Sequence, residues 1–374
     1  MNYSGKRSII NNRAVIGYKC LVNKKLKKYC CCGYFCKVKK DIEEVTPMKY
    51  HAKIDLAVLL IFFVRDDQFY KVFEQIKIVK PSRLYLYQDG PRKDRPDDLE
   101  GIARCRKIAE NIDWECDVHK LFQEENVGCD PSEFIAQKWM FETEEMGVVL
   151  EDDDVPSQSF FPFCKDLLER YKDDKRINMI CGMNNTGVSE HVAGDYLFTK
   201  KGSIWGWASW RRVIDTWDEN YSWLDDGDAV GALSNTFDNI YEFDSFIKTA
   251  QMHRESGKAH YESINGASLF LFNQLNIVPK YNMISNIGVG EETTHGVSNL
   301  KLLPRSIRRL MCMETYDIDF PMEHPKYIIQ DKKFERAATI TYSQAIINKI
   351  EGIFLHIRYG KFSILIQKLK SYIG

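Results

Sequence analysis

Gly147-Val-Val-Leu-Glu-Asp-Asp-Asp154 places four consecutive acidic residues directly after a short, mostly apolar run. The apolar part predicts a buried strand, and the acids then lie where that strand ends. Carboxylates packed together repel one another, so such a cluster is costly without a cation. Oxygen ligands of this kind suit Mg²⁺ or Mn²⁺, which commonly bind one or two carboxylates together with substrate phosphates. The stretch therefore predicts a metal–diphosphate site at a strand end.

Upstream of this stretch, apolar segments alternate with segments of helical periodicity. We expect strands at residues 54–64, 83–87, 116–122 and 147–150, and helices at 69–79, 97–111 and 131–145, the last capped by Asp130. This alternation predicts an α/β fold with a mostly parallel sheet flanked by helices. In such sheets ligands gather beyond the carboxyl ends of the strands. Arg65, Asp89 and the acidic run 151–154 all lie at such ends and should form one crevice.

Charge is distributed unevenly along the 374 residues. The formal net charge is −1, yet residues 1–40 contain eleven Lys or Arg and no Asp or Glu. A basic arm on an acidic body favours an anionic surface such as lipid headgroups. The rest of the sequence shows no basic face of the kind that binds nucleic acid. We therefore expect a membrane surface as a partner through the basic termini, and no nucleic acid.

Eleven cysteines without the spacing of a disulfide framework are typical of a reducing compartment. Five lie in the arm without a C-x2-C pair or a nearby histidine, so no structural zinc is expected: Cys20, Cys30, Cys31, Cys32 and Cys36. The longest apolar run, Leu56–Val64, is far short of the ~20 residues of a membrane helix, and no signal peptide is evident. These features predict a cytoplasmic protein that can associate with the inner face of the membrane.

Neither a G-x-x-x-x-G-K-[ST] loop nor a G-x-G-x-x-G motif accompanies the first strand, which disfavours P-loop and dinucleotide enzymes. Seven other segments occur in order over roughly residues 54–325: Arg65, Tyr87-Gln-Asp-Gly-Pro-Arg92, Glu125-Asn-Val-Gly128, Val149-Leu-Glu-Asp-Asp153, Trp205-Gly-Trp-Ala-Ser-Trp-Arg-Arg212, Ser285-Asn-Ile-Gly-Val-Gly290 and Thr294-His-Gly296. Together they resemble GT-A nucleotide-sugar glycosyltransferases with a DxD motif. The pattern is most similar to bacterial nucleotide-diphospho-sugar transferases related to N-acetylglucosaminyltransferase I.

The resemblance implies a GT-A, Rossmann-like fold and specific residue roles. In that family, the residues matching Arg65 and Asp89 hold the nucleotide and contact its base. The residue matching Asp153 binds the metal, expected to be Mn²⁺ or Mg²⁺, that bridges the two phosphates. Asp152 would face the sugar or ribose, and His295 would close over the diphosphate or the metal.

The same nucleotide-sugar site is expected to include Asn126 and two tryptophans. Trp205 and Trp207 flank Gly206, which allows a close backbone approach, and aromatic faces stack well on sugar C–H groups. Core packing is the competing interpretation of this segment. For Trp210 we expect core packing.

An inverting transferase also needs a base for the acceptor hydroxyl. Relatives place it in an acidic, aromatic segment that matches Ala259-His-Tyr-Glu-Ser-Ile-Asn265, where an Asp flanked by Trp would be expected. This chain departs from that pattern, and Glu262 is the candidate base with His260 behind it. The departure leaves open a different acceptor or a loss of activity.

The C-terminal residues change character. Residues 344–374 contain one acid, five Lys or Arg and a series of apolar residues at helical spacing. Such a basic amphipathic segment can lie in a membrane interface, pack on the core or form a dimer. We therefore expect a basic arm over 1–50, a transferase domain over 51–330 and a helical tail over 331–374.

The sequence as a whole predicts a metal-dependent glycosyltransferase that moves a hexosyl or N-acetylhexosaminyl group from a nucleotide-diphosphate sugar to a glycan or lipid-linked acceptor. The resemblance favours a UDP-sugar donor and an inverting mechanism. We expect the enzyme to act in polysaccharide biosynthesis. Two alternatives remain open: a metal-dependent nucleotidyltransferase, and a catalytically retired domain that binds nucleotide sugar or glycan.

Overall fold

The structure is a computed structural model that describes residues 50–289 and 299–360. By its internal contacts the chain divides into two units, Met1–Thr46 and Pro47–Gly374, and every described residue belongs to the second. The predicted metal ligand His295, the arm cysteines and the end of the basic tail lie outside the described residues.

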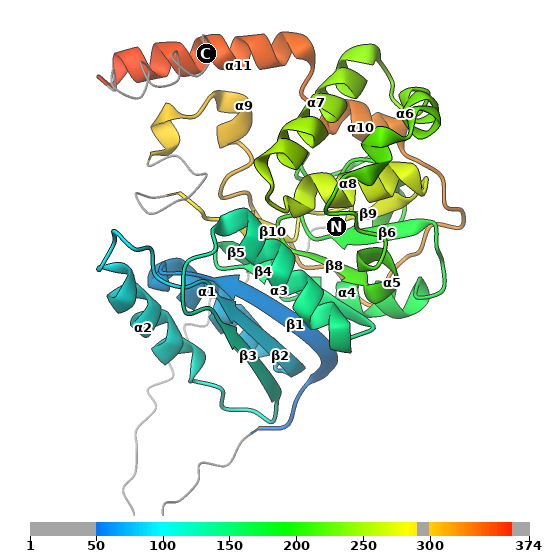
Figure 1. Cartoon of the computed structure of the whole chain (residues 1–374). Helices are drawn as coiled ribbons and strands as arrows, with labels where there is room; N and C mark the ends of the chain where they lie inside the picture. Colours follow the sequence, from blue (N-terminus) through cyan, green and yellow to red (C-terminus); the bar gives the residue numbers. More distant parts are fainter. Residues whose placement is uncertain (1–49, 290–298, 361–374) are drawn as a thin grey trace, which may run out of the picture. The chain divides into compact units, whose positions relative to one another are not determined.

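The first half of the second unit alternates strands and helices, as predicted. The elements are β1 (Ile54–Phe62), α1 (Asp66–Val79), β2 (Pro81–Gln88), α2 (Asp98–Ala109), β3 (Asp117–Phe122), α3 (Cys129–Thr143) and β4 (Met146–Glu151). β1 pairs in parallel with both β2 and β4, and β2 pairs in parallel with β3 (Figure 1). The expected cap of α3 is wrong. Gly128 occupies that position with a φ of 97°, which favours glycine, and Asp130 lies in the first turn.

The second half adds shorter elements. They are β5 (Asp154–Pro156), α4 (Phe160–Arg170), β6 (Ile177–Cys181), β7 (Tyr196–Thr199), β8 (Trp207–Trp210), α5 (Arg211–Ile214), a 3₁₀ helix (Ser222–Asp225), α6 (Gly227–Ser234), α7 (Ile240–Ser256), α8 (Tyr261–Leu271), β9 (Leu275–Pro279), β10 (Ile284–Asn286), a second 3₁₀ helix (Leu300–Leu302), α9 (Arg305–Arg308), α10 (Lys332–Ala338) and α11 (Tyr342–Arg358). Within the described residues, eight strands form one sheet in the order β3-β2-β1-β4-β8-β6-β9-β7. β8 runs antiparallel to both of its neighbours, and β5 pairs with β10 outside this sheet.

This mostly parallel sheet flanked by helices confirms the predicted α/β fold. The order 3-2-1-4 of its first four strands is the order found in Rossmann-like sheets. Among the described residues, no helix combines the length and apolar character needed to cross a bilayer.

The core covers both faces of the sheet. Leu56, Val58 and Leu60 of β1 belong to one buried cluster, with side chains of α1, α2 and α4. Ala57 and Leu59 face the opposite side and belong to a second cluster, with side chains of α3 and α8. Alternating residues of β1 are therefore buried on both sides, as expected for a central parallel strand. Because the buried strand is held so firmly, the loops beyond its carboxyl end have a rigid base.

Candidate functional site

The carboxyl ends of β1 and β4 bring Arg65 to the acidic run. One Arg65 nitrogen bonds Asp152 Oδ1, and its Nη1 lies 2.9 Å from Asp153 Oδ2. The backbone N–H of Phe63 also donates to Asp152, at 3.3 Å. Burial alone would lower the pKa of Arg65, but the charges of Asp152 and Asp153 raise it above its ordinary value. Burial raises the pKa of Asp152 to about 6, although Arg65 opposes the shift.

Asp154 has a different role from its two neighbours. It is completely buried and accepts hydrogen bonds from Gly206 N at 2.8 Å and Asn286 Nδ2 at 3.1 Å. The same Asn286 amide donates to Asp153 Oδ1 at 2.9 Å. Asp154 and Asn286 also face each other in the β5–β10 pair. Asp154 and Asn286 therefore tie the acidic run to the segments around residues 206 and 286, which sequence reasoning did not foresee.

Two glycines allow this close packing. A Cβ on Gly288 would lie 2.2 Å from Asp153 Oδ2, and a Cβ on Gly206 would lie 2.4 Å from Ile284 Cδ1. Gly206 also has a φ of 60°, which favours glycine. The prediction that Gly206 allows a close approach is confirmed.

Asp89 organises the loop before α3. Its carboxylate accepts from Gly90 N at 2.8 Å, Val127 N at 2.9 Å, Gly128 N at 3.1 Å and Asn126 Nδ2 at 2.7 Å. Burial raises the pKa of Asp89, while the backbone donors act to lower it. Asp89 and Asn126, which come from separate motifs, are thus in direct contact. Their expected contact with a nucleotide stays a prediction.

A pocket joins these groups. Its walls come from the ends of β1, β2 and β4 and from the start of α3, and they are formed by Ile61, Phe62, Phe63, Arg65, Asp89, Arg92, Asn126, Gly128, Cys129, Ser132, Glu133, Glu151 and Asp152. The predicted convergence of three strand ends on one crevice is therefore present in the structure. Four of the predicted site residues line it: Arg65, Asp89, Asn126 and Asp152.

Two glutamates that line this pocket had no individual role assigned from the sequence: Glu133, and Glu151 of the acidic run. Glu133, on α3, is 8% exposed, and burial together with the charge of Glu262 raises its pKa to about 8. Burial, followed by the charges of Glu133 and Asp154, raises the pKa of Glu151 well above its usual range. Nothing in the sequence marked Glu133, because a single Glu in a helix looks like a solvated residue. Strongly raised carboxyl pKa values in a cleft are typical of functional sites.

The tryptophan segment packs in or against the core, and none of its tryptophans lines the pocket. Trp207 is 2% exposed and stacks on Tyr261 with ring centroids 6.3 Å apart. Trp210 is equally buried, and its Nε1 donates to Leu168 O at 3.0 Å, so the expected core position of Trp210 is confirmed. Trp205 is half-buried against the first core cluster. In this packing Trp207 presents no free face to a sugar.

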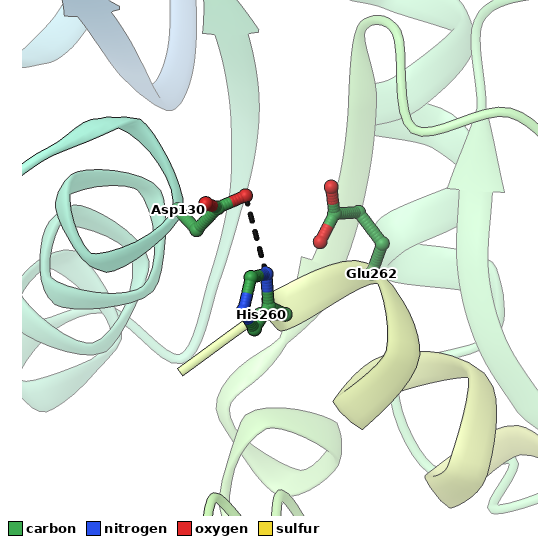
Figure 2. A group of neighbouring side chains, drawn as sticks. All are labelled: Asp130, His260 and Glu262. Atoms are coloured by element: carbon green, nitrogen blue, oxygen red, sulfur yellow. Dashed lines mark ion pairs between the residues drawn. The ribbon is translucent and has the colours of Figure 1, made fainter. Parts of the chain in front are cut away.

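The predicted catalytic pair lies at the start of α8, opposite the first turn of α3. Figure 2 shows Asp130, His260 and Glu262 with their polar ends turned toward one another. His260 Nδ1 lies 3.3 Å from Asp130 Oδ1, and one ligand atom from each of the three residues lies within 4.8 Å of the others. His260 and Asp130 are largely shielded, whereas Glu262 is exposed. Sequence reasoning found His260 and Glu262 but assigned Asp130 only to the helix cap.

The acidic run and this triad are close enough for their charges to act on the same side chains. The charges of Glu262 and Asp154 both act on Glu133, and those of Glu133 and Asp153 act on Glu151. Burial, followed by the same set of carboxylates, also raises the pKa of Tyr261, between His260 and Glu262. The carboxylates thus form a continuous acidic region, and Arg65 is paired with one end of it.

Comparison with known proteins gives no family. No protein-family model matches the chain, and no curated protein matches it. Similar solved structures include a UDP-glucose pyrophosphorylase with UDP-glucose, at 9% identity, 44% coverage of this chain, 79% of the other and a TM-score of 0.27. An apo UDP-glucose pyrophosphorylase shares 7% identity, with coverages of 62% and 93% and a TM-score of 0.33. The inositol-1-phosphate CTP transferase from T. maritima shares 11% identity, with coverages of 45% and 76% and a TM-score of 0.27. Superpositions this partial support no inference about activity or substrate.

Proposed function

We propose that the chain is a metal-dependent glycosyltransferase that takes a sugar from a nucleotide-diphosphate sugar and transfers it to a glycan or lipid-linked acceptor, with inversion. A UDP-sugar donor is favoured by the resemblance at Asp89. The observation that carries the proposal is the buried pairing of Arg65 with Asp152 and Asp153 at strand ends that share a pocket with Asp89 and Asn126.

The residues present fit a divalent cation. Several carboxylates meet here, the Arg65 guanidinium pairs with two of them, and a cation would relieve the repulsion that remains. Asp153 would hold Mn²⁺ or Mg²⁺, the remaining ligands coming from phosphate oxygens. Bound there, the metal supplies positive charge for the leaving diphosphate. His295 is proposed as a further ligand on the resemblance alone.

The chain's own residues would position the donor. Arg65 presents a planar guanidinium that can donate two parallel hydrogen bonds to a phosphate. Asp89 fixes the backbone of the 126–128 loop, and Asn126 would contact the nucleotide beside it. The exposed carboxylate of Glu262 would accept the proton of the acceptor hydroxyl, with His260 beside it. Trp205 remains a candidate for sugar contact, and Trp207 would have to leave its core packing to reach one.

The donor site is tested by thermal stabilisation with UDP, GDP, CMP and dTDP sugars, each with and without Mn²⁺. A ligand at about 100 times its Kd stabilises the native state by about 2.7 kcal/mol. Wild type should respond to one nucleotide sugar in the presence of Mn²⁺, and Asp153→Asn should lose that response. Asp244→Asn, which neutralises an exposed acid on α7, is the matched control and should behave as wild type. Absence of any wild-type response would contradict the proposal.

The reaction type is tested by product analysis. A glycosyltransferase releases UDP from the UDP-sugar, whereas a nucleotidyltransferase releases pyrophosphate from UTP and a sugar 1-phosphate. Glu262→Gln should lower UDP release by 10²–10⁴-fold while donor binding is unchanged, as expected for loss of a general base. Pyrophosphate release would establish the nucleotidyltransferase alternative. Donor binding without turnover in wild type would establish the retired domain.

We also propose that α11 (Tyr342–Arg358) contributes to membrane association. Its exposed apolar side chains are Ile346, Ile347, Ile350, Ile353, Phe354 and Ile357. The other side of the helix is held by Glu351 and Asn348, which accept hydrogen bonds from Arg305 N at 3.1 Å and Ser306 Oγ at 2.6 Å. Such a face suits the interface of an anionic bilayer.

The membrane proposal predicts sedimentation with anionic vesicles and loss of that binding in Ile350→Glu. Ile78→Glu, at an exposed apolar position on α1, is the control for the added charge. Equal vesicle binding by wild type and Ile350→Glu would contradict the role of α11.

A further inference from the structure

We infer that Asp130, His260 and Glu262 form a binding site for a divalent transition-metal ion, separate from the metal position proposed at Asp153. The donor set is one imidazole nitrogen and two carboxylates, which suits Mn²⁺, Co²⁺ or Zn²⁺. A site of three protein ligands leaves a coordination position for the oxygen of water or of a hydroxyl compound. The exposed Glu262 side chain places that position toward solvent.

The hydrogen bonds around His260 fix which ring nitrogen faces the triad. The single hydroxyl hydrogen of Ser256 is donated to His253 O at 2.7 Å. Ser256 Oγ must therefore accept at its 3.1 Å contact with His260 Nε2, so that nitrogen carries the hydrogen. In the neutral imidazole the lone pair is then on Nδ1, which faces Asp130 Oδ1. A second hydrogen bond that sets the tautomer in this way is typical of metal-binding histidines.

The separation of Nδ1 from the Asp130 carboxylate also leaves room for a shared cation. The distance is 3.3 Å, and two other His–Asp pairs of the described residues, His191–Asp331 and His119–Asp117, are 2.7 and 3.2 Å apart. Two ligands at about 2.0–2.1 Å from a tetrahedral Zn²⁺ lie about 3.3 Å apart. A charge-assisted hydrogen bond is shorter, about 2.7–2.9 Å.

The ligands are held by separate, rigid elements. The His260 ring stacks on His253 of α7, with centroids 3.8 Å apart and planes 17° apart. Asp130 lies in the first turn of α3, next to Pro131, and Glu262 lies in the first turn of α8. A cation would therefore connect the start of α3 with the start of α8, beside the acidic region. The site uses both side chains of the proposed catalytic pair, so with the ion bound Glu262 would be a ligand and no longer the free base. Metal binding itself requires no nucleotide.

The test is Mn²⁺ binding without nucleotide, followed by electron paramagnetic resonance. Mn²⁺ also avoids the arm cysteines, because soft thiolates bind it poorly. We expect spin-echo modulation from an imidazole ¹⁴N in wild type and in Asp153→Asn, where the other proposed metal position is removed. The modulation should disappear in the Asp153→Asn/His260→Gln double variant, and His191→Gln should retain it.

Two isosteric variants keep the test independent of folding defects. Asp130→Asn and Glu262→Gln should each raise the Kd for Mn²⁺ at least tenfold, while the melting temperature without metal shows that the fold is intact. The inference is overturned if Asp153→Asn binds no Mn²⁺ with ¹⁴N modulation, or if the modulation survives in the double variant. Failure of the nucleotide-sugar experiments would leave this result unaffected, and the converse also holds.

Discussion

Glu133 is a buried acid whose ionisation should destabilise the fold. Its pKa is raised from 4.5 to about 8, first by burial and then by the charge of Glu262. The unfolded chain therefore releases the proton near pH 4.5, while the folded chain keeps it up to about pH 8. The folded state binds more protons between these values, so the free energy of unfolding must fall as the pH rises through this window.

The size of the effect follows from the same shift. Each unit of pKa difference corresponds to about 1.4 kcal/mol, so by pH 7 the loss approaches about 3 kcal/mol. Glu133→Gln resembles the protonated acid and removes this loss. In metal-free buffer the variant should match wild type at pH 4.5 and exceed its free energy of unfolding by up to about 3 kcal/mol at pH 7. The glutamine oxygen can still accept the 3.4 Å contact from Cys129 Sγ.

The assay is urea unfolding at the two pH values, with Glu142→Gln as the control. Glu142 lies on the same helix but is exposed, so the same change of charge should have little effect at either pH. The reasoning is refuted if the difference between Glu133→Gln and wild type is the same at pH 4.5 and pH 7, or if the variant is the less stable protein at pH 7.

Three other substitutions follow from the geometry. Arg65→Met leaves the buried Asp152 and Asp153 without their partner and should lower the free energy of unfolding by about 3–5 kcal/mol near pH 8, with a smaller loss near pH 5, as measured in urea. Gly288→Ala should push the Asp153 carboxylate aside and weaken Mn²⁺-dependent nucleotide-sugar binding at least tenfold in calorimetry, because the added Cβ would lie 2.2 Å from Oδ2; Gly231→Ala, with open space around it, is the control. Asn286→Ala removes a donor to both Asp153 and Asp154 and should cost about 1–3 kcal/mol in thermal unfolding.

The alternation of strands and helices before residue 151 could be predicted because each local signal agreed with the global fold. β1, for example, is apolar without interruption from Leu56 and ends in the polar crevice, and the structure places it inside the sheet, between β2 and β4. Periodicity does not encode which strands pair after β4. β8 lies antiparallel between β4 and β6, and this position depends on the tertiary packing of short segments. No residue spacing in the sequence predicts it.

The candidate site likewise has a part that could be predicted from the sequence and a part that could not. Arg65, Asp89 and the acidic run follow strands, so their convergence is dictated by topology. Glu133 and Asp130 come from the start of α3, which lines one wall of the crevice, and their approach to Glu262 depends on how α3 and α8 pack. The burial of Trp207 was unpredictable for the same reason, since a tryptophan suits both a sugar platform and a core.

Buried carboxylates elsewhere in the chain show that the acidic region is not a general feature of this fold. Asp98 is 2% exposed, yet hydrogen bonds from Arg92 lower its pKa. Glu335 is 3% exposed, and its pKa is also lowered, because hydrogen bonds from Gln330 and Lys200 N outweigh the effect of burial. At these two structural positions the fold therefore supplies hydrogen-bond donors that stabilise the ionised carboxylate. The pKa values of Glu133 and Glu151 are raised first by burial and then by the charges of neighbouring acids. Positive charge brought in from outside would offset this loss of stability, and the proposed metal-dependent transfer would supply it.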